Sequence, residues 1–502
     1  MKGIKEIFGK LKEFILNNIL LTILFLISTI FFISQHYLDL SWDFSAYVIN
    51  AKFFFYGGDY YEVYRAPLIS ILLGFFLIFS KFGEYLYILF VCVLFFYSNI
   101  RLSKTLYDKY FYKYDIEKRF FVFLFYFFSL NSFLLFNGLI IGTELLGLAF
   151  FELFLAAYIK NKNSGHYLGL AFLSRYNLLF FSVLLLFNKN YKKIIKNILL
   201  MFIIILPWLV YNYIVWGNFF TSIVDSYFLN VYNRISIVEP FNFLSLILPI
   251  NWFLPFLIVG ILYVLFEFFK LKKRRFSDNK IILLFIFIYV LVFLDCYSTP
   301  FKVSRYMFNM TLPIAFFSTI GMIYLLNKFK NKMNIILTIL MIAFIVFTFI
   351  LFYGFFLNRH SQEKFAEAGS AIKSLGLLEC KVVSPIWVPV NYYTSNVYYM
   401  GEDIDSEIFN KRIILIFPCC ETMDDNFNMS DIERYPYLYK SSDFVLIAQK
   451  GLTNKTCAKR VGYSSPMVEK PCELIGERFK KMRILNKIIE KGCMFINFKY
   501  EK

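Results

Sequence analysis

Long apolar runs are the feature that most limits the folds open to this chain. The first, FILNNILLTILFLISTIFFI, covers residues 14–33, and similar runs recur as far as residues 335–357. About 18 consecutive apolar residues are enough for a helix to cross a bilayer. Hydrophobic residues make up 59% of the 502 positions, more than the roughly 45–50% of an average globular chain. We therefore expect a polytopic α-helical protein of the cell membrane, with the first run kept as an anchor.

The positions of the basic residues predict how the chain crosses the membrane. Lys/Arg-rich breaks separate the apolar runs at residues 1–12, 101–119, 160–166, 188–197, 270–280 and 327–332. Such breaks are typical of cytoplasmic loops. Placing all six in the cytoplasm leaves the alternate loops poor in basic residues. This arrangement predicts about eleven crossings, a cytoplasmic N-terminus and an external C-terminal region. It also explains the net charge of +18 without a nucleic-acid partner.

Two apolar stretches do not read as simple crossings. PLISILLGFFLIF, residues 67–79, is short for a bilayer and lies in the first outer loop, so we expect a juxtamembrane helix there. The stretch at residues 166–187 has cytoplasmic signals at both ends and carries Arg175 in its middle. A charge inside a membrane is costly. Two short helices with Arg175 to Asn177 at their outer tip would satisfy both observations.

The first outer loop, SWDFSAYVINAKFFFYGGDYYEVYRAPL, has more charged and aromatic residues than a simple connecting loop needs. Asp43 comes a few residues after the first membrane helix, and Arg65 comes just before the short helix. A carboxylate beside apolar walls at the bilayer surface would hold protons more tightly, a useful property in a general base. An acid that simply faces water is the other interpretation. We expect Asp59 and Glu62 to be ordinary loop acids unless another residue contacts them.

A second acid, Glu144, opens a later membrane helix at the same outer face. Its simpler interpretation is a first-turn acid that favours the helix dipole, after an N-cap at Thr143. Few basic residues accompany these acids at the outer face: Lys52, Arg65, Lys81, Arg175, Arg234, Lys302 and Arg305. Arginines among carboxylates and aromatic rings suit a phosphate and a sugar. Each arginine could equally anchor to lipid headgroups.

The composition changes near residue 357, which we take as the boundary between a membrane domain (1–356) and an external domain (357–502). Short β-rich runs at residues 381–385, 396–401, 412–417, 444–449 and 493–500 alternate with helical patterns at 361–376 and 475–491. This alternation predicts an α/β domain. Six of the eight cysteines lie here, and six allow 15 disulfide connectivities. Cys457–Cys472 is the pairing that we would test first. An aromatic run at residues 384–401 could stack on sugars or belong to the core.

Several segments together resemble the GT-C-fold glycosyltransferases of the dolichyl-phosphate-mannose protein mannosyltransferase and aminoarabinose transferase type. The matching segments are Asp43 after the first helix, YRAPLISILLG, GTELLGLAFF, YLGLAFLSRYNLLFF and LPWLVYNYIVWGNFFTS. They keep the family's order over about residues 1–355. Ala66, the lone Asp43 and Phe219 depart from the usual residues, which leaves subfamily and substrate open.

The resemblance implies transfer of a sugar, mannose or a related one, from a polyprenyl-phosphate or dolichyl-phosphate donor at the outer face, with inversion. The acceptor would be a protein, glycan or lipid. In that scheme Asp43 is the base and Glu144 positions the acceptor or the base. The donor would be bound by Tyr64, Arg65, Arg175, Arg305 and Tyr306. If the reaction uses a divalent metal ion, Asp43 and Glu144 would be its ligands.

Two other functions remain open at this point. A membrane transporter or flippase would favour inverted repeats and polar residues deep in the spans, whereas these spans are mostly apolar. A scaffold protein would have no use for acids and arginines gathered at one face. A membrane glycosyltransferase is the interpretation that fits best.

Overall fold

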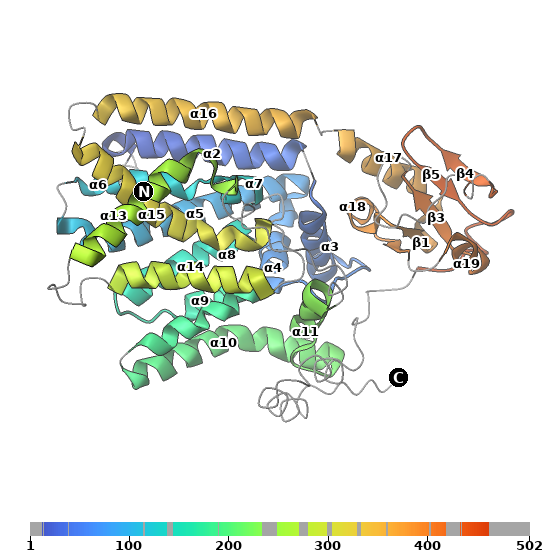
Figure 1. The fold of residues 1–502 in the computed structure, drawn as a ribbon. Helices are drawn as coiled ribbons and strands as arrows, with labels where there is room; N and C mark the ends of the chain where they lie inside the picture. The colour runs from blue at the N-terminus through green and yellow to red at the C-terminus, as the bar shows by residue number, and fades with distance from the viewer. Residues whose placement is uncertain are drawn as a thin grey trace, which may run out of the picture.

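The structure, a computed structural model, has a helical bundle with a small α/β domain at one end (Figure 1). It describes residues 13, 15–38, 40–113, 116–137, 144–188, 190–232, 248–270, 280–298, 304–328, 333–357, 360–400, 403–417, 432 and 434–460. The bundle elements not treated individually below are η2 (Phe111–Lys113), α6 (Lys118–Ser129), α7 (Ser132–Asn137), η4 (Phe228–Tyr232) and η6 (Leu248–Phe253).

Within the described residues, four helices are long and apolar enough to cross a membrane. They are α2 (Ile19–Leu38), α5 (Lys81–Lys109), α10 (Tyr191–Trp216) and Met307–Lys328, which contains α15 (Thr311–Lys328). Other apolar helices of the bundle are α13 (Leu254–Lys270), α14 (Lys280–Ser298) and α16 (Met333–Leu357). The polytopic helical architecture expected from the apolar runs is present, while the count of eleven crossings stays a prediction.

Close packing of α13 against α15 illustrates how the bundle is held. A Cβ added at Gly260 would lie 1.9 Å from the carbonyl oxygen of Phe317, and one at Gly321 would lie 2.1 Å from that of Phe256. Small residues allow membrane helices to approach this closely, because lipid supplies no hydrophobic force between them. The two glycines therefore set the distance between these helices.

The first outer loop folds into two helices, α3 (Trp42–Tyr56) and α4 (Pro67–Phe76), followed by the turn η1 (Leu77–Phe79). Ser41 caps α3 by accepting a hydrogen bond from the Phe44 amide, and Gly57 ends it with φ of 66°, a backbone conformation that glycine adopts without strain. Pro67 occupies the first turn of α4, where its missing N–H costs nothing. The short helix expected at residues 67–79 is thus found.

The segment with Arg175 is a helical hairpin, as the basic residues at both of its ends predicted. α9 (Gly165–Ser174) rises to an extended Arg175, and η3 (Tyr176–Phe187) returns. The N-terminal end of α9 is held by Asn197, whose Oδ1 accepts a hydrogen bond from the Gly165 amide at 3.0 Å. On the way back, Phe181 packs on Phe151 of α8 (Glu144–Ile159), with ring centroids 4.5 Å apart. The hairpin tip consequently lies at the first turn of α8.

The C-terminal domain has a five-stranded sheet in the order β2-β1-β3-β5-β4. Its strands are β1 (Val382–Ser384), β2 (Val397–Tyr399), β3 (Ile413–Ile416), β4 (Tyr437–Lys440) and β5 (Val445–Ile447), and its helices are α17 (His360–Ser374), η9 (Leu377–Glu379), α18 (Trp387–Asn391) and α19 (Ile404–Phe409). β1 pairs in parallel with β2 and β3, and β5 pairs antiparallel with β3 and β4. Four predicted strands are found, β4 was missed, and the helix and strand expected at 475–491 and 493–500 lie outside the described residues.

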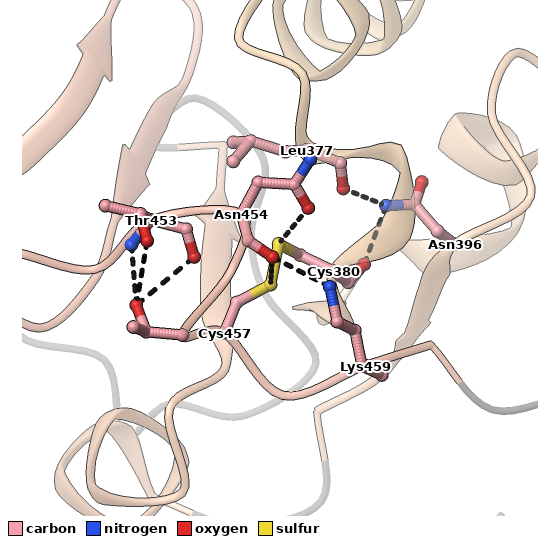
Figure 2. Close-up of a disulfide and its surroundings, with 8 residues drawn as sticks. Leu377, Cys380, Asn396, Thr453, Asn454, Cys457 and Lys459 are labelled. Atoms are coloured by element: carbon pink, nitrogen blue, oxygen red, sulfur yellow. Dashed lines mark hydrogen bonds between the residues drawn. A yellow bond between two sulfur atoms is a disulfide. The ribbon is translucent and has the colours of Figure 1, made fainter.

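The preferred disulfide pairing was wrong. Cys457 bonds to Cys380, with Cα atoms 5.6 Å apart (Figure 2). The reason is a tertiary pairing: the Lys381 amide donates to the Ala458 carbonyl at 2.7 Å, and Cys380 forms a β-bridge with Lys459. The returning chain thus brings Cys457 to Cys380 at the start of β1 and not to Cys472.

Candidate active site

The first part of the site is an ion pair between Asp43 and Arg65 in the first outer loop. Asp43 lies in the first turn of α3, and Arg65 Nη1 donates to its Oδ1. The two side chains are only 12% and 13% exposed. The prediction that apolar walls surround Asp43 was therefore incomplete, because a cation contacts it directly. A neighbouring cation favours the charged carboxylate, which is the form that accepts a proton.

The loop reaches Asp43 because it runs back along α3. Asn50 Nδ2 donates to the carbonyl of Glu62 at 3.1 Å, and the Glu62 amide donates to Asn50 Oδ1 at 2.9 Å. These two hydrogen bonds fix Glu62 to the middle of α3. Arg65, three residues after Glu62, is thereby placed beside the first turn of α3. A short loop thus becomes one wall of the site.

Glu62 also belongs to the site, because Arg65 contacts it and it is then no longer expected to be an ordinary loop acid. Its Oε2 accepts from Arg65 Nε at 2.7 Å, and its side chain is 1% exposed. Arg65 therefore holds two carboxylates, one at each end of the guanidinium. Asp59, by contrast, pairs with Arg460 at 2.7 Å, and both of these side chains are about one-third exposed, as an ordinary loop acid would be.

The environment keeps Arg65 firmly charged. Burial by itself lowers the pKa of the guanidinium, but the Asp43 carboxylate and then the Tyr64 phenol raise that pKa well above its ordinary value. Tyr64 lies against the cation, with Arg65 Cζ 5.0 Å from the ring centroid. The predicted substrate-binding residues Tyr64 and Arg65 therefore contact each other.

The second part of the site is an ion pair between Glu144 and Arg175 at the hairpin tip. Arg175 Nη1 donates to Glu144 Oε1, and Glu144 is fully buried. Arg175 Nε donates to Asn177 Oδ1 at 3.2 Å, and Asn177 Nδ2 donates to Asp295 Oδ2 at 3.0 Å. Asp295 at the end of α14 thereby joins a site that the sequence assigned to other acids. The alternative cap, Thr143, lies outside the described residues.

Tyr47 is near enough to both ion pairs for their charges to act on its phenol. It is 4% exposed, and Arg65 Cζ lies 5.5 Å from its ring centroid. Burial is the main cause that raises the pKa of Tyr47 above its ordinary value, with Asp43 and Glu144 acting in the same direction. Arg65 and Arg175 act against it. All four charges thus influence one phenol on α3, so Asp43/Arg65 and Glu144/Arg175 form one site around Tyr47.

A buried hydroxyl network supports the backbone of Arg65. The Tyr176 hydroxyl donates to the Arg65 carbonyl at 3.2 Å, accepts from Trp208 Nε1 at 2.9 Å and lies 3.0 Å from Ser222 Oγ. Asn212 Nδ2 also donates to Ser222 Oγ at 3.0 Å. Ser222 belongs to α11 (Thr221–Tyr227), and Trp208 and Asn212 belong to α10. The segment LPWLVYNYIVWGNFFTS therefore contributes to the site by fixing Tyr176.

Two sequence signals could have found part of what was missed. Asp43 and Tyr47 are four residues apart, and Asn50 follows three later, so a helix over this stretch puts them on one face. Tyr176 follows Arg175 directly. Nothing local identifies Ser222 or Asp295 as neighbours of the arginines.

The side chains of the remaining predicted residues lie outside the described part of the structure. Arg305 and Tyr306 begin η7 (Ser304–Met310), and only their backbone is described. The helix itself reaches the site, because Arg175 Cζ lies 4.7 Å from the ring centroid of Phe308. Arg234 and Lys302 lie outside the described residues.

The donor set does not fit a resident divalent metal ion. The two expected ligands, Asp43 and Glu144, each contact an arginine, which would repel a cation. Among the described residues, no three His, Cys, Asp or Glu side chains gather as a metal site would need. The metal prediction accordingly gains no support from the residues that surround these carboxylates.

Comparison with solved structures identifies the fold of the chain. No protein-family model and no curated protein matches the chain. Among solved structures it is similar to ArnT from Cupriavidus metallidurans bound to undecaprenyl phosphate, with a TM-score of 0.55, 12% identity, and 86% of this chain and 98% of that chain covered. The apo state of the same ArnT gives a TM-score of 0.52, 12% identity, and coverage of 88% and 99%. The likeness extends over nearly all of ArnT, and the chain therefore has the fold of ArnT, in agreement with the resemblance that its motifs indicated.

Proposed function

We propose that this protein is a membrane glycosyltransferase that moves a sugar, mannose or a related one, from a polyprenyl-phosphate donor to an acceptor at the outer face of the membrane. The single observation that carries the proposal is the pairing of Asp43 with Arg65 and of Glu144 with Arg175 around Tyr47. It combines a proton acceptor with two cations for a phosphate in one buried place. The ArnT structure with bound undecaprenyl phosphate supports the same class of donor.

In the proposed reaction Asp43 acts as the general base. It takes the proton of an acceptor hydroxyl while the oxygen attacks the anomeric carbon of the donor sugar. The bond from that carbon to the phosphate oxygen breaks, and the electron pair leaves with the polyprenyl phosphate. Attack opposite the leaving group inverts the anomeric configuration. One displacement needs a single base, which agrees with one acid, Asp43, on the outer helix α3.

The two arginines stabilise the charge that develops on the leaving phosphate. Preorganised cations aimed at developing charge are often the largest contribution to catalysis. Arg65 is held by Asp43 and Glu62, and Arg175 by Glu144 and Asn177. Their geometry is set before the donor binds, so little reorganisation is needed. No step of this scheme passes through a metal ion.

The outer-face location fits the donor chemistry. A polyprenyl phosphate keeps its chain in the bilayer while its sugar must meet an aqueous acceptor. α3 and α4 lie at the end of the bundle that faces the C-terminal domain (Figure 1), where a membrane-embedded donor could present its headgroup. We propose that this end is extracytoplasmic and that the N-terminus is cytoplasmic.

A transfer assay separates this function from transport. The purified protein in proteoliposomes receives polyprenyl-phosphate mannose labelled in the sugar, together with a membrane extract as acceptor. A transferase moves the label from the lipid phosphate to acceptor material and leaves free polyprenyl phosphate. A flippase leaves the donor intact and only changes its leaflet, which periodate oxidation from outside would detect. Redistribution without loss of the donor would contradict the proposal.

A further inference from the structure

Three aromatic rings that are not buried meet at the seam between the membrane domain and the C-terminal domain, and the first of them, Trp42, directly precedes Asp43. Trp42 opens α3, Trp387 opens α18 and Tyr399 ends β2. The Trp387 ring centroid lies 4.7 Å from that of Trp42 and 4.9 Å from that of Tyr399, both edge to face. We name these three residues the aromatic platform. Trp387 and Tyr399 come from the aromatic run that the sequence marked as able to stack on sugars.

The platform is held firmly relative to the carboxylate. Trp387 Nε1 donates to the Tyr60 hydroxyl at 2.8 Å, and Tyr60 is 6% exposed. Beneath it, Ile49 of α3 belongs to the same buried cluster as residues of the sheet. Trp42 directly precedes Asp43 on one rigid helix turn. The rings therefore keep a constant position with respect to Asp43.

Interface packing explains only part of this arrangement. The Trp42–Trp387 contact joins the two domains and would be expected in any tight seam. Tyr399 is different, because it is 57% exposed although its strand neighbours are buried. A membrane-interface aromatic would also be exposed, but Tyr399 is carried by the sheet of the C-terminal domain and not by a membrane helix. An exposed ring that reaches the site through Trp387 and Trp42, the residue before the candidate base, points to a ligand.

We propose that the platform binds the acceptor, and that the acceptor is a saccharide whose ring stacks there and presents a hydroxyl to Asp43. This inference rests on the proposed function. Aromatic rings supply rigid apolar faces with polar edges, which match a sugar ring with one C–H face and hydroxyls around its rim. A phosphate as nucleophile would bring a second anion to Asp43 and Glu62 and would have no proton for a base to remove.

The chemical linkage of the transferred sugar tests the acceptor class. Native membranes containing the protein are given the labelled polyprenyl-phosphate sugar, and the product is degraded. Recovery of the label bonded to another sugar supports the proposal. Release as a monosaccharide by alkaline β-elimination would place it on a peptide hydroxyl, and release by mild acid would place it on a phosphate; either result overturns the proposal. If the wild-type protein transfers no label, the proposed function itself fails.

Substitution of Tyr399 tests the platform independently. Tyr399→Ala should raise the apparent KM for the acceptor-bearing membrane fraction by about two- to tenfold, the range for one aromatic contact. The KM for the donor and the kcat at saturation should stay unchanged, and Tyr399→Trp should restore the acceptor KM. Phe409→Ala, which removes an 84% exposed ring of the same domain, is the matched control. A wild-type acceptor KM in Tyr399→Ala, or a change in donor KM instead, would refute the platform.

Discussion

Arg65 binds Asp43 across 22 positions of sequence, and the same guanidinium binds Glu62 through its Nε at 2.7 Å. The fork of an arginine can hold two carboxylates at once, whereas the ammonium of a lysine is a point charge. Arg65→Lys should therefore keep the positive charge and lose the geometry. We expect the kcat/KM for the donor to fall by about tenfold to a hundredfold, the range for one or more charged hydrogen bonds.

Arg101→Lys is the control for that change, because Arg101 is exposed and its guanidinium lies near the Tyr97 ring, away from the site. It should leave the kcat/KM for the donor unchanged. Equal kcat/KM for the donor in Arg65→Lys and the wild-type protein would mean that Arg65 contributes only charge.

The Tyr176 hydroxyl connects the α10–α11 corner to the carbonyl of Arg65. Tyr176→Phe removes this donor and leaves the ring in place. We expect transfer to slow by about three- to tenfold, which corresponds to one hydrogen bond of about 1 kcal/mol, with the KM for the donor nearly constant. The loss should appear in kcat because Arg65 is misplaced for the developing charge.

Tyr126→Phe provides a matched control within the same bundle. Tyr126 is 1% exposed, and its hydroxyl lies 3.1 Å from Ser28 Oγ, so this variant also loses one buried phenol contact. If both variants lose thermal stability equally but only Tyr176→Phe loses kcat, the hydroxyl is a positioning group. Equal loss of kcat in both would mean that the effect is merely structural.

The Cys380–Cys457 disulfide closes a sequence separation of 77 residues. A loop of that length gives a cross-link worth about 4.5 kcal/mol in the loop-entropy treatment. Cys380→Ser should therefore make the C-terminal domain sensitive to protease at temperatures where the wild-type domain resists. Cys92→Ala, which removes a buried free cysteine of α5, should not have this effect.

Peptide mapping without reductant checks the pairing itself. It should recover the peptide of Cys380 joined to that of Cys457. Recovery of Cys457 joined to Cys472 would contradict the structure and restore the pairing that we would have tested first from the sequence.

Chelation tests the role of metal. Because Asp43 and Glu144 each contact an arginine, the transfer rate should be the same with and without an excess of EDTA. A rate that falls with EDTA and returns with one divalent ion would show that a cation takes part and that these ion pairs open in the working enzyme.

Much of the fold could be predicted because membrane insertion constrains sequence strongly. Arg175 is a good example: a charge in an apolar stretch with cytoplasmic signals at both ends predicted a hairpin, and the structure has one. Asp43, Glu144 and the arginines were selected by position and by family resemblance, and the structure brings Asp43, Arg65, Glu144 and Arg175 around Tyr47.

The rest depends on how distant segments pack, which no local pattern records. Glu62 is a site residue only because Asn50 draws the loop back along α3. Ser222 matters only because α11 packs beside Tyr176, and Cys457 finds Cys380 only through the β-bridge beside β1. These three contacts are set by tertiary register, so the sequence alone did not identify the partners of Glu62, Ser222 and Cys457.

The central claim is that Asp43 is the base of a sugar transfer, and one comparison within its own loop tests it most directly. Asp43→Asn keeps the shape of the side chain and removes its basicity, so the rate of transfer from the labelled polyprenyl-phosphate sugar should fall by about a hundredfold or more. Asp59→Asn removes a partly exposed acid of the same loop and should stay within twofold of the wild-type rate. A folded Asp43→Asn protein that transfers the label at the wild-type rate would contradict the account.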